Sequence, residues 1–387
     1  MDKVGNNMVT VTCGTKFHSD YTAFQLQQHN LLEKVITAHP SKKYLNRVSI
    51  EKKRAKFLAP IFVPAYLLSR IFSGSNFMVK WLDNNMPILF DLLAAKNVKR
   101  SKIILAYAWS ALESIKTVKK NGGIALVEEC GSCNKYQNEI LDEEYRKLGL
   151  TFKSPTPDFI VKRQLTEAEL ADYLLCPSNH VIGSFVENGI DRAKCILIPY
   201  GVNKDIFKAY HLHKDEFTII CVGTIGVRKG QYYLFEALQQ LAQRIAVKCI
   251  LIGKVEDQFI AYYNQYKHLF THYDYIPHQE LVNYYNKASV FVLPSLDEGL
   301  ALVQLEAMAC GLPIISTPNA GADAIIDDRK EGYIVPIKDA SAIANRIEML
   351  YNDHILLKKM SENAICKSEK FSWDNYGEKL ADFINSL

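Results

Sequence analysis

Short apolar segments alternate with longer stretches of helical periodicity along most of the chain. Runs in which nearly every residue is apolar indicate strands of a parallel sheet that helices cover on both faces. In the first half of the chain these runs are residues 8–13, 102–107, 124–127, 173–176 and 195–199. A second series follows at residues 217–222, 247–252, 273–276, 290–293, 313–316 and 333–335. Two such series predict two doubly wound α/β domains.

A polar, turn-forming segment at residues 198–216 separates the two series of strands. We therefore place a first Rossmann-like domain at residues 1–205 and a second at residues 206–365. The chain ends in helical periodicity without a further strand, so residues 366–387 are assigned to a carboxyl-terminal helix.

The loop after the predicted strand 290–293 carries the first candidate chemistry. In open parallel sheets, ligands bind beyond the carboxyl ends of the strands. This loop holds Glu298 and leads into a helix that contains Glu306 and ends near Gly311. The backbone amides and the positive dipole end at the start of such a helix bind phosphate. Two acids beside a phosphate site suit a ligand that also carries hydroxyl groups, although each acid alone fits an ordinary exposed position equally well.

A second loop follows the predicted strand 217–222 and reads VGTIGVRKG. Its glycines allow a ligand to approach the backbone closely, and Arg228 and Lys229 can neutralise a diphosphate. The spacing matches neither the dinucleotide fingerprint nor a P-loop, so a solvated basic turn is the alternative. Because both loops open on the same edge of one sheet, a diphosphate between them would place its attached group near Glu298.

Composition narrows the class of protein. Hydrophobic residues make up 48% and charged residues 23% of the 387 residues, the balance of a folded two-domain enzyme. The net charge is only +4, and the positive excess is concentrated in residues 42–56, so we expect no nucleic-acid partner. The sequence contains no Asp-x-Asp pair, which favours chemistry without a metal ion.

Nine cysteines without a regular pattern favour a reducing compartment. Cys130 and Cys133 are closely spaced, but no second pair follows, so we interpret them as ordinary thiols rather than half of a zinc site. The amino terminus lacks a basic start and a long apolar run, so we expect no signal peptide and a cytoplasmic location.

These motifs resemble a known family. The run EGLALVQLEAMACGLPI, with VRKG upstream, is similar to the E-x7-E signature of family-four retaining glycosyltransferases, which have the GT-B fold. The resemblance extends from about Ile103 onward, through ADYLLCPSNHVIGSFVENGIDRAKCILIPYGVN, GADAIIDDRKEGYIVP and FSWDNYGEKLADF. It implies two Rossmann-like domains facing across a cleft, with the last helix crossing back onto the first domain.

The resemblance also implies roles for individual residues. Glu298 would contact hydroxyls of the transferred sugar, Glu306 would hold the donor ribose, and Lys229 would hold the diphosphate of a UDP- or GDP-linked sugar. We assign catalysis to Glu298 and Lys229, and donor binding to Arg228, Gly223, Thr224, Ile276, Gly299, Leu300, Ala301, Leu302 and Glu306. No cofactor is expected. The leaving diphosphate would itself help to deprotonate the acceptor, with retention of configuration.

The sequence departs from the family pattern at several positions. Thr224 stands where the family often has arginine, and Arg228 is placed to supply that charge; Ala301 replaces a frequent glycine. The family's amino-domain histidine has no match after the strand 124–127, where Glu129 and Asn134 are the nearest polar residues. On the acceptor side we therefore assign Gly14, Thr15, His18, Glu129 and Asn134. For His18, contact with the acceptor and an ordinary surface position are both open.

The basic stretch and the apolar run after it, Lys42 to Phe72, fit two hypotheses. In the first, cations meet anionic lipid while Phe57, Leu58, Phe62 and Tyr66 enter the membrane interface, which would suit a lipid-linked acceptor. In the second, the stretch is a solvated loop followed by a core helix.

Several functions compete at this stage. A transferase acting on a glycan or lipid-linked acceptor, in surface polysaccharide or glycolipid synthesis, agrees with most of the motifs. A nucleotide-sugar epimerase or a sugar phosphorylase could use a similar cleft. From another class, a catalytically silent subunit that binds sugar nucleotides is compatible with Thr224 and the missing histidine.

Overall fold

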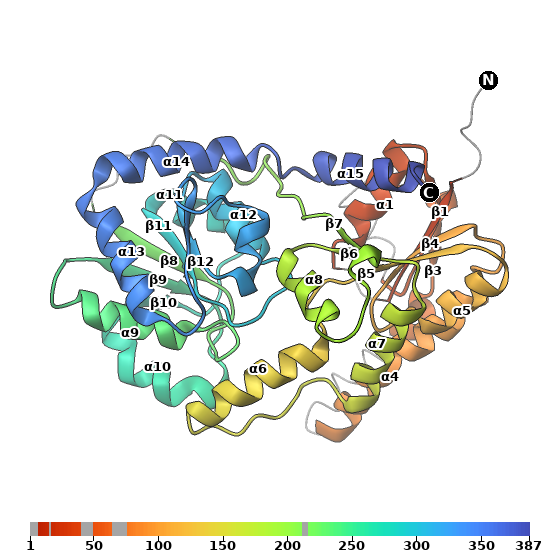
Figure 1. Cartoon of the computed structure of the whole chain (residues 1–387), viewed down its shortest axis with the longest axis horizontal. Helices are drawn as coiled ribbons and strands as arrows, with labels where there is room; N and C mark the ends of the chain where they lie inside the picture. Colours follow the sequence, from red (N-terminus) through yellow and green to blue (C-terminus); the bar gives the residue numbers. More distant parts are fainter. Residues whose placement is uncertain (1–6, 15–16, 40–48, 64–75, 211–215) are drawn as a thin grey trace.

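The computed structural model describes residues 7–14, 17–39, 49–63, 76–210 and 216–387 of the chain. These residues form two parallel sheets with helices around each, in two lobes that lie side by side (Figure 1). The predicted pair of doubly wound domains is confirmed.

The first sheet has the strand order β3-β2-β1-β4-β5-β6-β7, and every pairing is parallel. Its strands are β1 Val9–Cys13, β2 Leu32–Thr37, β3 Ala55–Phe57, β4 Ile103–Tyr107, β5 Ile124–Glu128, β6 Tyr173–Cys176 and β7 Cys195–Leu197. The order reverses between β1 and β4, and the carboxyl ends of these two strands therefore bound a crevice.

The second sheet repeats this arrangement in the order β10-β9-β8-β11-β12-β13. Its strands are β8 Thr218–Val222, β9 Lys248–Ile252, β10 Thr271–Tyr273, β11 Val290–Leu293, β12 Ile314–Ser316 and β13 Gly332–Ile334. Here the order reverses between β8 and β11, the two strands that precede the loops singled out in the sequence.

Helices cover both sheets. Those of the first domain are α1 Ser19–Gln28, α4 Asn76–Ala95, α5 Leu112–Lys120, α6 Asn134–Lys147, α7 Asp158–Leu170 and α8 Asn179–Val186. Those of the second are α9 Gln231–Leu241, α10 Ile260–Tyr266, α11 Leu281–Lys287, α12 Leu302–Ala309, α13 Ala340–Asn352 and α14 His354–Ser368, and α15 Trp373–Asn385 follows.

Three strands differ from the predicted pattern. Strands β2 and β3 were not predicted, because Glu33 and Lys34 interrupt the apolar run of β2 and β3 is short and contains Lys56. The strand predicted at 273–276 is wrong, since β10 ends at Tyr273. Strand β10 is an edge strand with largely exposed residues, so it lacks the continuous apolar pattern of the central strands.

The last helix joins the two lobes. Helix α15 runs from the second lobe to lie beside α1 of the first (Figure 1). Its apolar face is buried, and the rings of Trp373 and Tyr21 stack with centroids 4.3 Å apart. Thr22 Oγ1 lies 3.0 Å from the hydroxyl of Tyr376, and the Gln25 amide donates to Asp374 over 2.7 Å. These contacts tie the end of the chain to its beginning.

The structure corrects part of the membrane hypothesis. Within the stretch from Lys42 to Phe72, residues 40–48 and 64–75, including Tyr66, lie outside the described residues. Leu58 and Phe62 are buried, and the Phe62 ring packs 6.1 Å from that of Phe90. These two side chains belong to the core and cannot enter a lipid interface. Among the helices that the structure describes, none is both long and apolar enough to span a bilayer.

Candidate active site

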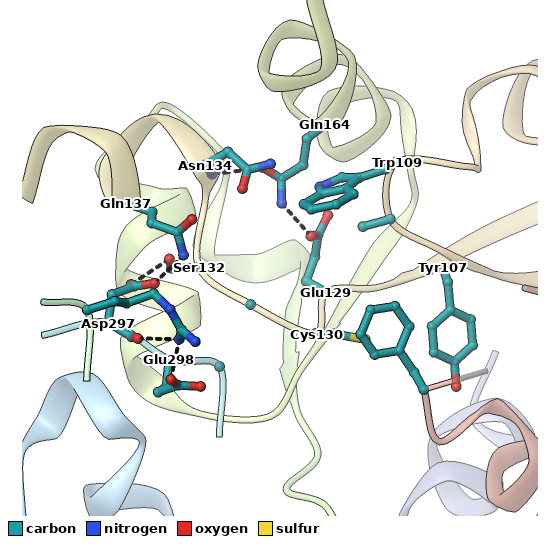
Figure 2. A pocket seen from close by; sticks show the side chains of 15 residues that line it. Tyr107, Trp109, Glu129, Cys130, Ser132, Asn134, Gln137, Gln164, Asp297 and Glu298 are labelled. Carbon is teal, nitrogen blue, oxygen red and sulfur yellow. Dashed lines mark hydrogen bonds and ion pairs between the residues drawn. The ribbon is translucent and has the colours of Figure 1, made fainter. Parts of the chain in front are cut away.

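The carboxyl ends of the central strands of both sheets meet around a cavity of about 370 Å³. The first domain lines it with the turn after β4 and the segment after β5. The second domain contributes Arg228 and the loop from Asp297 to Gly299. Of these residues, Figure 2 labels Asp297 and Glu298. The cavity therefore lies where the topology of open α/β sheets predicts a ligand site.

Glu298 lies in the loop between β11 and α12. Its carboxylate pairs with the guanidinium of Arg228 and, over 2.6 Å, with the ammonium of Lys229. Helix α12 begins at Leu302, and its N-cap residue Ala301 makes no side-chain cap hydrogen bond, so within the described ranges no capping side chain occupies the amide groups of its first turn. The structure thus brings together the three charged side chains and the helix start that the sequence singled out.

Gly230 explains how the basic loop approaches Glu298. Its φ is 68°, a left-handed conformation that glycine adopts without strain, and a Cβ atom there would lie 2.0 Å from the carbonyl oxygen of Pro294. The loop after β8 can therefore pack directly on the loop after β11. Gly223 lies against the aliphatic chain of Lys229, while the Thr224 carbonyl accepts a hydrogen bond from Gln231.

Glu306 lies beside a second cavity of about 520 Å³. One carboxylate oxygen is 2.7 Å from His278 Nε2, and the other accepts a hydrogen bond of 3.2 Å from the Tyr285 hydroxyl. His278 and Phe207 line this cavity together, with ring centroids 5.1 Å apart. Sequence analysis missed His278, although the residue follows β10 in one of the loops at the ligand-binding edge of the sheet.

The remaining predicted donor residues lie in different places relative to the two cavities. Gly299 lines the first cavity and Leu302 the second, while Leu300 and Ala301 are buried between them. Ile276 is partly buried against the hydrophobic core and lines neither cavity.

On the acceptor side, His18 is not on the surface. It is 5% exposed, its Nε2 lies 3.2 Å from Glu128 Oε1, and its ring packs 4.2 Å from that of Tyr200. The structure thus corrects the surface alternative, and His18 connects α1 to β5 within an aromatic cluster. Gly14 packs against Phe90, and Thr15 lies outside the described residues.

Glu129 and Asn134 both line the first cavity. The Gln164 side chain connects them, since its amide nitrogen donates to Glu129 over 2.9 Å and its oxygen accepts the backbone N–H of Asn134 over 2.9 Å. Burial raises the pKa of Glu129 well above its usual range, and the hydrogen bond from Gln164 opposes this only in part. Gln164 was not predicted, because an interior position of a helix carries no local signal of a site.

Asp297 fastens the two domains together beside Glu298. It is fully buried and accepts hydrogen bonds from Ser132 Oγ over 2.6 Å and from Gln137 Nε2 over 2.5 Å (Figure 2). His180 Nε2 lies 2.8 Å from the same carboxylate. All three partners belong to the first domain, so we call Asp297 and these partners the interdomain clasp. The sequence showed Asp297 only as the neighbour of Glu298.

Cys130 and Cys133 are free thiols, and burial raises the pKa of both. Among the residues with described positions, no group of three or more histidine, cysteine or acidic side chains is arranged to hold a metal ion.

The architecture and the cleft define the class of fold. The chain is similar over its whole length to a sucrose-phosphate synthase from Thermosynechococcus elongatus, with a TM-score of 0.69, 18% identity and 98% of both chains covered. It is also similar to HepE from Anabaena, solved in complex with UDP and glucose, with a TM-score of 0.67, 14% identity, and 98% of this chain and 100% of that chain covered. The fold is therefore GT-B.

Sequence comparison matches the second domain to a family. Residues 202–366 match the model of the family described as glycosyl transferases group 1, so this part of the chain is similar to that family. The capsular polysaccharide biosynthesis glycosyltransferase CapM of Staphylococcus aureus is 31% identical over 213 residues, covering 54% of this chain and 55% of CapM. A D-inositol 3-phosphate glycosyltransferase of Streptomyces bingchenggensis is 36% identical over 103 residues, which cover 27% of this chain and 23% of that enzyme. The matched part thus spans about half or less of these relatives.

Proposed function

We propose that the chain is a glycosyltransferase that moves a sugar from a nucleotide diphosphate sugar to an acceptor hydroxyl. The observation that carries this proposal is the meeting of Lys229, Arg228 and Glu298 beside the open start of α12, in a cleft between two domains. The similarity to the group 1 family and the UDP bound to HepE, which has the same fold, support it.

In this proposal the donor diphosphate binds Lys229, Arg228 and the first amides of α12. The two cations now pair with Glu298, so a diphosphate would take over these partners and free the carboxylate for hydroxyls of the transferred sugar. Glu306 would accept hydrogen bonds from the ribose, with Phe207 and His278 beside the base. UDP is the first nucleotide to test.

The reaction breaks the bond between the anomeric carbon and the diphosphate and forms one to the acceptor oxygen. Positive charge grows on the sugar and negative charge on the leaving group, so fixed cations at the diphosphate stabilise the transition state more than the ground state. We propose that the acceptor proton passes to the departing diphosphate on the same face of the sugar. Configuration is then retained, and neither a metal ion nor a cofactor is needed.

A donor panel tests this function. UDP-, GDP- and ADP-sugars are offered with and without a chelator, and nucleoside diphosphate release is followed. We expect at least one donor to react equally in both conditions, and Glu298→Gln and Lys229→Ala to lower the rate by about a hundredfold or more. The exposed Glu362→Gln and Lys287→Ala serve as controls. Full activity in both site variants would contradict the proposal.

The same panel separates the alternatives. A silent binding subunit would bind a donor without transferring its sugar to any acceptor and without releasing nucleoside diphosphate, and an epimerase would alter the donor sugar without transferring it. A phosphorylase would transfer a sugar only when inorganic phosphate is present to receive it. The intact set of Glu298, Glu306 and Lys229 favours the transferase.

The acceptor is proposed to be a glycan or a lipid-linked sugar in surface polysaccharide or glycolipid synthesis, a role that CapM suggests by its name. A peripheral membrane contact would then rest on exposed cations such as Lys52 and Lys53, together with Arg54, rather than on Leu58 or Phe62. Flotation with anionic liposomes that is unchanged after Lys52, Lys53 and Arg54 become glutamate would exclude this contact.

A further inference from the structure

The half of the first cavity that belongs to the first domain combines a polar floor with aromatic walls. Glu129, Gln164 and Asn134 follow one another along one side, and Trp109 lies next to Glu129 (Figure 2). Phe17 also lines this half, and its side chain is largely exposed. This half faces Glu298 across the cavity, where the acceptor would meet the donor sugar.

Two atoms of the polar floor lack hydrogen-bond partners. Oε1 of Glu129 and Nδ2 of Asn134 are both buried, and neither has a partner in the described part of the chain. Burial of an unpaired polar atom is unfavourable, so such atoms in a cavity indicate a ligand that completes their hydrogen bonds. One atom belongs to a carboxyl group and the other is an amide donor.

Trp109 is held in place by its backbone. Its φ is 72°, a conformation that is unfavourable for a bulky residue. The Glu167 carboxylate accepts its N–H over 2.7 Å, and Arg163 Nε donates to its carbonyl over 3.0 Å. The indole nevertheless stays partly exposed along the cavity. Backbone strain that neighbouring residues hold in place is common at residues that contact a ligand.

The electrostatics of this half disfavour an anion. Burial is the main cause that raises the pKa of Glu129, and the nearby carboxyl groups of Glu167 and Glu128 raise it further. The cation in the described cavity lining, Arg228, lies on the opposite side and is paired with Glu298. A phosphate placed beside Glu129 would thus add negative charge where acidic groups already gather.

We propose that this half of the cavity binds the acceptor as an uncharged, hydroxyl-rich ring, a sugar residue, and that Glu129 and Asn134 hydrogen-bond to its hydroxyl groups. A hydroxyl both donates and accepts, so neighbouring hydroxyls can satisfy the carboxyl oxygen and the amide together. The apolar face of the ring would pack on Trp109. An acceptor that carries phosphate next to the reacting hydroxyl is disfavoured. This inference rests on the proposed transferase function.

The test compares matched acceptors with the donor that reacts fastest in the panel. Methyl hexosides are measured against hexose phosphates and inositol phosphate, with products identified by mass. We expect kcat/KM for the neutral hexosides to exceed that for the phosphorylated compounds by at least about tenfold. Preference for a phosphorylated acceptor would overturn the inference.

Variants link this preference to the named residues. Glu129→Ala is expected to raise the acceptor KM by about tenfold or more, with donor affinity unchanged. Glu129→Gln, which keeps a hydrogen-bonding group of the same shape, is expected to restore most of the affinity and guards against a mere folding defect. Glu139→Ala, an exposed change on α6, is the control. An unchanged acceptor KM in Glu129→Ala would also overturn the inference.

The two proposals fail in different ways. If no nucleotide sugar binds, the transferase function fails and this inference falls with it. If a donor binds and releases its diphosphate but no neutral hexoside is glycosylated, the inference alone is wrong.

Discussion

Glu298 and its two cations form a charged group in which Glu298 and Lys229 are shielded from most of the solvent, while Arg228 is 36% exposed. The carboxylate is 15% exposed and Lys229 12%, so their attraction is screened less than that of a surface pair. A diphosphate can replace the carboxylate as partner of both cations, and the freed, largely buried carboxylate then takes sugar hydroxyls as its hydrogen-bond partners. Donor binding and release of Glu298 are therefore expected to be one event.

Substitution of Gly299 tests how closely the two domains must approach each other beside Glu298. A Cβ atom there would lie 1.9 Å from the carbonyl oxygen of Cys130 in the first domain. Gly299→Ala is expected to keep both domains folded but to force the cleft open, lowering the transfer rate at least about tenfold. Small-angle scattering and kinetics measure the two effects. Gly183→Ala, where an added Cβ meets open space, is the control, and an unaltered rate in Gly299→Ala would refute the expectation.

At the scale of elements, the turn between β4 and α5 depends on one carboxylate of α7. Glu167 accepts the backbone N–H groups of Trp109, Ala111 and Leu112 over 2.7–3.0 Å. It is buried beside Arg163, which pairs with it over 3.1 Å. Helix α7 thereby fixes the start of α5 and the position of the Trp109 ring at the cavity.

The pH dependence of the protein's stability should reflect the protonation of the Glu167 carboxylate. Burial raises the pKa of Glu167 from 4.5 to about 7, so the folded protein binds this proton more tightly than the unfolded chain does. The resulting stabilisation is fully present below about pH 4.5 and is lost as the pH rises through 7, a change on the order of 3 kcal/mol. Thermal unfolding across this range, compared with Glu167→Gln, measures it. An identical pH slope in both proteins would disprove the assignment.

At the scale of the whole molecule, several contacts join the domains, and two groups of them lie at the cleft. Helix α15 packs on α1 at one end of the cleft, and the interdomain clasp around Asp297 closes it beside Glu298. Because Asp297 and Glu298 are adjacent in sequence, the clasp positions the proposed catalytic carboxylate whenever the domains are closed.

Asp297→Asn should weaken the clasp. The amide presents one acceptor oxygen and an N–H group to three partners that now face a carboxylate, and an unsatisfied buried group costs about 1–3 kcal/mol. We expect a larger radius of gyration and a lower transfer rate, with nucleoside diphosphate affinity largely kept, because the proposed donor residues belong to the second domain. Asp382→Asn, an exposed change on α15, is the control. A compact, fully active variant would show that the clasp is not needed.

The sequence by itself determined the two parallel sheets and the loops that carry Lys229 and Glu298. A strand that is buried on both faces has a continuous apolar sequence, which can be recognised without a structure. The glycines and charged residues that follow such a strand then mark the loop at its end. Strands β2, β3 and β10 lie at or near the sheet edge, where solvent permits polar residues and the pattern fades.

Only the tertiary structure decided which distant residues meet. Asp297 with its three partners, Gln164 beside Glu129, and His278 beside Glu306 join positions from different elements or domains. Local sequence carries periodicity and turn chemistry, whereas these contacts depend on how whole elements pack. For the same reason, the burial that raises the pKa of Glu129 and removes His18 from the surface could not be predicted from their neighbours in the chain.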